Sequence, residues 1–123
     1  MARPYTCEQV WSLAATSSDV FTVDYTDLLG SGETLAAVSG TVTAGGISYS
    51  LGVTVPTGIT AGTATINSGA VTVNGVTIAT SKAVQVRLST NGATVGRRCS
   101  IVVAVSTSAG NVLPVEAVLE IIG

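Results

Sequence analysis

Apolar and polar residues alternate along much of this chain, and turn residues separate the alternating runs. A period of two is typical of β-strands that bury one face. Val, Ile and Thr dominate these runs, and β-branched side chains favour strands over helices. The runs occupy residues 20–25, 35–43, 47–55, 83–89, 100–107 and 112–122. The pattern predicts a nearly all-β protein.

The clearest local signal is a hairpin over residues 70–79. Asn74-Gly75 stands between two alternating runs, and both residues tolerate the positive φ that a type I′ turn requires. Pro56 ends the run before it, since proline donates no backbone hydrogen bond. Pro114 lies inside the last run, so we expect it on a sheet edge or near the start of that strand.

Short strands every eight to twelve residues, with turns between them, are typical of a two-layer sandwich or a small barrel. We expect residues 19–123 to form an antiparallel, immunoglobulin-like β-sandwich of about seven to nine strands. The Cys-Trp-Cys pattern of true antibody domains is absent.

Residues 1–18 form a separate arm in this interpretation. Residues 8–15 predict a short helix capped by Thr6, because Val10, Leu13 and Ala14 share one helical face. A helix this short is marginal alone, so it either covers one end of the sandwich or docks on another subunit. The candidate interface residues are the large apolar side chains Tyr5, Trp11, Leu13 and Phe21.

Charge is sparse. Only 10% of the residues are charged, against about 25% in typical domains. Either Ser, Thr, Asn and Gly hydrate the surface, or much of the surface is buried against partners in a permanent assembly, where interface cores are depleted in charge. The two explanations are compatible. The net charge of −2 is too small to indicate a nucleic-acid partner.

The residues offer little for catalysis. The chain has no histidine and only two cysteines, which removes Ser-His-Asp sites and the usual zinc sites. Asp24, Asp27 and Glu33 are the densest acids, and a glycosidase pair needs only two carboxylates, but ordinary turn chemistry explains them better. Arg97-Arg98 is interpreted as a solvated loop edge. We expect no enzyme activity, no catalytic residue, no cofactor and no metal.

A disulfide between Cys7 and Cys99 is one possibility, but synthesis in a reducing compartment favours free thiols. The N-terminus lacks the apolar stretch of a secretory signal, and no run reaches the length of a membrane span. A protein made in a reducing cytoplasm seldom forms disulfides, and no membrane partner is expected.

Two stretches resemble a known family. Residues 24–38, from Asp24-Tyr25 through Gly32-Glu33-Thr34, are similar to the opening of the fibre-tail adaptors of tailed phages. Residues 100–111, with Thr107-Ser108-Ala109-Gly110, are similar to that family's closing strand. The chain departs from the pattern in its N-terminal segment and in residues 45–80.

The resemblance implies an immunoglobulin-like, non-enzymatic virion protein that is synthesised in the host cytoplasm. Its partners would be tail, fibre or capsid subunits, and it would be a homo-oligomer in the particle. Our first hypothesis is an adaptor joining tail and fibre. The alternative is a capsid decoration protein that grips the shell through its N-terminal arm and a sheet edge. A free carbohydrate-binding module is a third hypothesis, which the few scattered aromatic residues make weaker.

Overall fold

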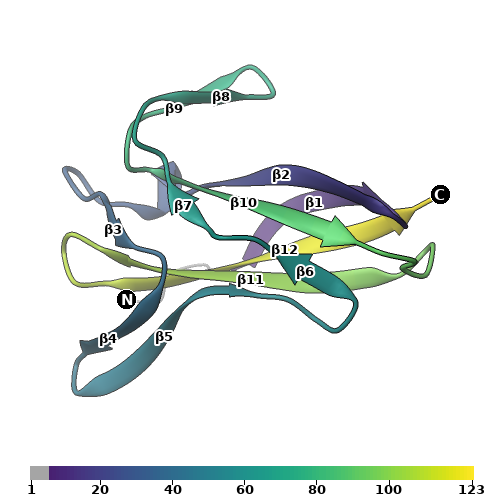
Figure 1. Cartoon of the computed structure of the whole chain (residues 1–123). Helices are drawn as coiled ribbons and strands as arrows, with labels where there is room; N and C mark the ends of the chain where they lie inside the picture. Colours follow the sequence, from purple (N-terminus) through teal and green to yellow (C-terminus); the bar gives the residue numbers. More distant parts are fainter. Residues whose placement is uncertain (1–5) are drawn as a thin grey trace.

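The computed structural model describes residues 6–123, with side chains from Val10 onward, and these residues form strands and one short 3-10 helix (Figure 1). The helix η1 (Thr26–Leu28) follows β2. No helix in the described part of the chain is long and apolar enough to span a membrane. The strands are β1 (Thr6–Ala14), β2 (Ser17–Asp24), β3 (Leu35–Ala37), β4 (Gly40–Ala44), β5 (Ile47–Thr54), β6 (Ile59–Ala61), β7 (Thr65–Ile66), β8 (Val71–Val73), β9 (Val76–Ile78), β10 (Ala83–Thr90), β11 (Arg98–Thr107) and β12 (Val112–Ile122).

Two sheets pack into a sandwich. The larger has the order β1-β12-β11-β5-β4, with β3 also paired to β11, and the smaller has the order β2-β10-β6, with β7 also paired to β10. Strands β8 and β9 form a separate two-stranded hairpin. The all-β sandwich predicted from the alternating pattern is confirmed. The described residues form twelve strands rather than the seven to nine expected, and β1 pairs with β12 in parallel rather than antiparallel.

Alternation along the central strands produces the core. In β11, Cys99, Ile101, Val103 and Val105 are buried. The residues that alternate with them, which are Arg98, Ser100, Val102 and Ala104, are exposed or half-buried. Strand β12 repeats the pattern from Leu113 to Ile121. Since successive side chains of a strand point to opposite faces, each central strand supplies one apolar face to the space between the sheets.

The run predicted as one strand over residues 35–43 is two strands. Strand β3 pairs with β11, and the chain then leaves the sheet at Gly40, whose φ of +82° suits glycine. Strand β4 pairs only with the first part of β5, and residues 52–54 of β5 return to β11. The β4–β5 hairpin is therefore an insertion between two segments that share β11, and it extends to the lower left in Figure 1.

The turn predictions hold. Asn74 and Gly75 have φ values of +52° and +80° between β8 and β9, as a type I′ turn requires. Pro114 lies near the start of β12, two residues before the first pair that β12 makes with β1, Thr6↔Glu116. The missing N–H of Pro114 therefore interrupts no β1–β12 pair.

The predicted N-terminal helix is wrong. Residues 6–14 form β1, which runs parallel to β12 from Val10↔Val118 to Ala14↔Ile122. Trp11 and Leu13 point into the core, whereas Val10 and Ser12 are exposed. Because the segment pairs with β12, its side chains alternate between the core and solvent. The helix signals in residues 8–15 are local and did not indicate this pairing. The segment is part of the sandwich, so a separate arm over residues 1–18 is not what the described residues show.

Two buried polar side chains connect the segment after β2 to β11 and to the turn between β11 and β12. The Tyr25 hydroxyl, which is fully buried, donates to the Val103 carbonyl at 2.9 Å. The Glu33 carboxylate, also buried, accepts from the Gly30 N–H at 2.8 Å and from the Asn111 side-chain amide at 2.7 Å. Its Oε2 also accepts from the Thr107 hydroxyl. A carboxylate with several donors can remain buried, because the bonds offset its desolvation.

Two hydrogen bonds between Thr34 and Ser108 extend this connection. The Thr34 N–H donates to the Ser108 hydroxyl at 3.0 Å, and the Ser108 N–H donates to the Thr34 carbonyl at 2.8 Å. Residues 24–38 and 100–111 thus meet at one end of the sandwich. These are the two stretches that carry the family resemblance.

We expect Glu33→Ala to lower the free energy of unfolding by about 2–4 kcal/mol, because it removes the acceptor of the buried Thr107 hydroxyl and of the half-buried Asn111 amide. The measurement is urea unfolding followed by circular dichroism. Asp27→Ala is the control, since Asp27 is exposed in the same loop, and it should change stability by less than about 0.5 kcal/mol. Equal effects of the two substitutions would contradict a structural role for Glu33.

Candidate interaction surfaces

The charged residues are unevenly distributed along the chain. Residues 34–81 contain no Asp, Glu, Lys or Arg, although Glu33 and Lys82 flank them directly. This segment includes β3 to β9, and hence both projecting hairpins. The low overall content of charged residues is therefore due largely to this one segment.

The β4–β5 hairpin has one apolar face and one hydroxyl face. Its cross-strand pairs alternate between the types Val42↔Tyr49 and Thr43↔Ser48. Since side chains alternate along both strands, Val42, Ala44, Ile47, Tyr49 and Leu51 share one face, and Thr41, Thr43, Ser48 and Ser50 share the other. Ile47 is 57% exposed and Tyr49 is 37% exposed. The apolar face is thus only partly covered by the chain itself.

A groove of about 480 Å³ lies between this hairpin and the neighbouring strands. We call it the Tyr49 groove. None of its lining side chains is charged. Ala104 of β11 and Pro114 of β12, which are paired, contribute to its lining. The Asn111–Glu33 hydrogen bond described above holds the turn that forms one wall. The lining residues are Ala44, Tyr49, Ser50, Ala104, Gly110, Asn111, Val112 and Pro114.

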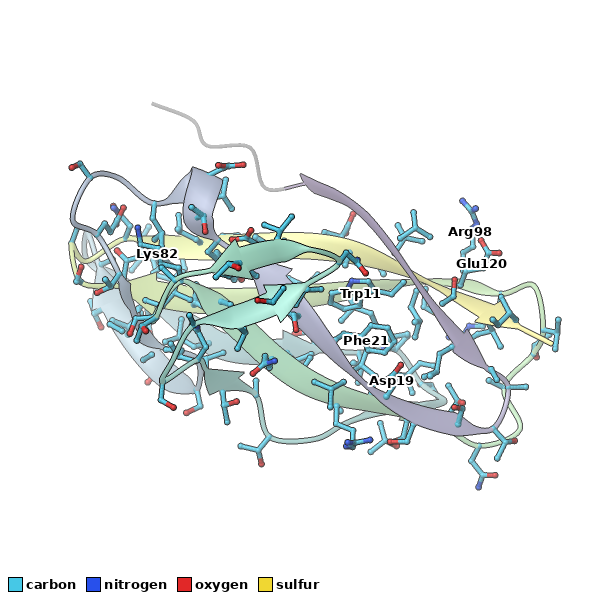
Figure 2. All side chains as sticks on the ribbon, turned by 90° about the horizontal axis from the view of Figure 1, so that it is seen from above. Trp11, Asp19, Phe21, Lys82, Arg98 and Glu120 are labelled. Atoms are coloured by element: carbon cyan, nitrogen blue, oxygen red, sulfur yellow. The ribbon has the colours of Figure 1, made fainter. Side chains whose placement is uncertain are left out.

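A second groove, of about 750 Å³, lies between β1, β2 and the β8–β9 hairpin. We call it the Trp11 groove. Trp11 and Phe21 stack in it, with ring centroids 4.9 Å apart, and Figure 2 shows Asp19 beside Phe21. Its lining residues are Val10, Trp11, Ser12, Asp19, Val20, Phe21, Thr22, Thr72, Val73, Asn74 and Gln85.

The structure places the four predicted interface residues differently. Leu13 is a core residue with 3% of its surface exposed. Trp11 is 8% exposed and packs on Phe21, so only a small part of its side chain lines the Trp11 groove. Phe21 is half-buried. Tyr5 lies outside the described residues. The placement of Trp11 and Leu13 does not support an arm that docks on another subunit, because the chain's own sandwich needs both side chains.

The acids and bases singled out from the sequence serve local structure. The Asp24 carboxylate accepts from the Thr26 N–H at 2.9 Å, which is turn chemistry. Arg97 donates to the Thr57 carbonyl at 2.9 Å, and Arg98 forms an exposed ion pair with Glu120 at 2.9 Å, visible in Figure 2. Within residues 6–123, the described side chains include no group of three or more His, Cys, Asp or Glu arranged to hold a metal ion.

Cys99 is a free, buried thiol. The free thiol expected at Cys99 is confirmed. The side chain of Cys7 lies outside the described set, so a free thiol at Cys7 stays a prediction.

Comparisons with known proteins add no relative. No family model matches the chain, and neither a curated protein nor a solved structure matches it.

Sequence reasoning missed Ile47 and Tyr49 as surface residues. Their signal was present in the alternation of Ile47, Tyr49 and Leu51 with serines inside an uncharged segment. That alternation predicted a strand with a buried face. Only the structure shows that this part of the strand leaves the sandwich, so that its apolar face is partly exposed.

We expect Trp11→Ala to lower the free energy of unfolding by about 3–5 kcal/mol, as large-to-small substitutions in a packed core do. Val10→Ala is the matched control, because Val10 is next to Trp11 on β1 but is 57% exposed. It should cost less than about 1 kcal/mol. Chemical denaturation of both variants measures the difference. A Trp11→Ala variant as stable as the wild type would show that Trp11 is not a core residue.

Proposed function

We propose that this chain is a non-enzymatic structural protein of a tailed-phage virion, and that it acts as an adaptor joining tail and fibre. The observation that carries the proposal is the uncharged segment 34–81, which includes a projecting hairpin with an apolar face. Strand β4 of this hairpin is the last strand of its sheet, and no described residue pairs with its outer edge. Monomeric proteins usually protect such edges with charged residues or proline, and interface cores are depleted in charge.

The family resemblance supports the same function. Its two stretches pair through β3 and β11 and are joined through Glu33, Thr107 and Asn111. Residues that look like a family signature in two separated stretches thus belong to one structural unit. The strand orders β2-β10-β6 and β12-β11-β5 match the B-E-D and G-F-C orders of an immunoglobulin-like sandwich, which is the fold that the resemblance implies.

The placement of aromatic residues favours assembly over sugar binding. A carbohydrate site needs an accessible aromatic face, but the face of Trp11 is covered by Phe21 and Tyr25 is fully buried. Tyr49 is the exposed aromatic residue in the described part of the chain, and uncharged side chains surround it.

A capsid decoration protein is the alternative, and the free edge of β4 favours it as well, because identical neighbours on a shell can repeat one edge contact many times. Copy number separates the two functions. Quantitative gel analysis of purified virions should find a few dozen copies at most for an adaptor, whereas hundreds of copies would establish decoration instead. Absence from the particle would overturn both.

We expect Ile47→Lys to reduce incorporation into particles at least about tenfold, because a charge on the apolar face is desolvated by any partner that covers it. The assay is complementation of a phage that lacks the gene, with copies per particle measured by immunoblot. Val95→Lys is the matched control: Val95 is 58% exposed and Ile47 is 57% exposed, but Val95 lies in the β10–β11 loop. Equal incorporation of the two variants would exclude the β4–β5 hairpin as the docking element.

A further inference from the structure

The edge strands of the two sheets differ in how far they are protected against pairing with another strand. In β2, an edge strand of the smaller sheet, the exposed Asp19 carboxylate accepts the N–H of Val20 at 2.8 Å. A charged residue that also occupies an edge donor discourages a further strand from pairing there. Strand β4, at the edge of the larger sheet, has no charge, no proline and no register shift in its pairing with β5. No strand in the described part of the chain pairs with the outer edge of β4, so this edge is open to pairing.

The sequence of β4 reads almost the same about its centre. Val42 is flanked by Thr41 and Thr43, and then by the small residues Gly40 and Ala44. An antiparallel pair of two β4 strands with a two-fold axis at Val42 places Val42 opposite its copy and Thr41 opposite Thr43 of the second chain. Threonine pairs are favourable cross-strand neighbours, and β-branched valine fits the pleated surface of a sheet. A charged β4 would place like charges near the axis, and this strand has none.

The backbone of β4 fits the same axis. Gly45 and Gly46, with φ of +60° and +80°, form a two-residue turn that pairs Ala44 with Ile47. The backbone N–H and C=O groups of successive residues point to opposite sides of a strand. Since Ala44 directs its groups to Ile47 of β5, Thr41 and Thr43 direct theirs to the free edge. In the two-fold pair, the N–H and C=O groups of Thr41 can therefore form hydrogen bonds with those of Thr43 of the second copy. The apolar faces of the two hairpins then continue into one four-stranded surface, and so do the hydroxyl faces.

We propose that β4 pairs antiparallel with β4 of a second copy of this chain, with a two-fold axis at Val42. This inference rests on the assembly function proposed above and names one of the partners as the protein itself. Pairing of five-residue strands buries less than the roughly 1,000 Å² of a stable interface. The dimer is therefore weak in dilute solution, and it forms where copies are held close together in a particle.

Disulfide trapping tests the register of this pair. In a Cys7→Ser background, which keeps the buried Cys99, a Val42→Cys variant is oxidised at high protein concentration and analysed by non-reducing gel. Facing positions in an antiparallel pair are about 4.5–5.5 Å apart between Cα atoms, within disulfide range. Val42→Cys should therefore yield at least about tenfold more covalent dimer than the background protein.

Neighbouring positions provide the matched control. Thr43→Cys in both copies places the Cα atoms about 8 Å apart by strand spacing, outside disulfide range, so it should give little dimer alone. A mixture of Thr41→Cys and Thr43→Cys proteins should give the mixed dimer, because these positions face each other. Circular dichroism checks that each variant is folded.

Two results would overturn the pairing. The first is absence of a Val42→Cys dimer from the folded protein at high concentration. The second is equal trapping at Val42 and Thr43, which would indicate random collisions. The experiment uses purified protein alone, so its failure leaves the location in the virion open. Absence from virions, conversely, would not affect the trapping result.

Discussion

Strand β11 organises the larger sheet and, through it, the whole sandwich. It pairs with β12, β3 and β5, and it buries one side chain in two from Cys99 to Val105. The Tyr25 hydroxyl connects the end of β2 to the Val103 carbonyl of the same strand. A substitution that disturbs β11 therefore reaches both sheets, whereas the two projecting hairpins lie outside the pairs and the core that β11 holds together.

Local sequence patterns predicted most of this fold because the strands are bounded by turns whose chemistry is local. Asn74-Gly75 is an example, since both residues must accept positive φ. The failure at residues 8–15 has a physical reason. Val10, Leu13 and Ala14 fit a helical face, and the competing strand pattern at Val10-Trp11-Ser12-Leu13 becomes stable only through pairing with β12, more than a hundred residues away. No local rule reports such a partner.

The candidate surface was less predictable than the fold, for a related reason. The uncharged segment and the alternation of Ile47 and Tyr49 with serines are visible in the sequence, but they do not say whether an apolar face meets the core or solvent. That depends on Gly40, where the chain leaves the larger sheet, and on Gly52, where β5 returns to it beside Ala104. The orientation of the hairpin is a tertiary property, and so is the Tyr49 groove beside it.

The distribution of aromatic residues limits what kind of contact this protein can make. Trp11 and Tyr25 are used in the core, and Phe21 packs on Trp11, so the large anchors that dominate strong interfaces are not available on the surface that the structure describes, apart from Tyr49. Contacts must then rely on backbone edges and on small apolar side chains such as Val42 and Ile47. Each such contact is weak. In the assembly proposed above, affinity would come from repeating one contact among many tethered copies. A symmetric particle provides that condition, and a solution of monomers does not.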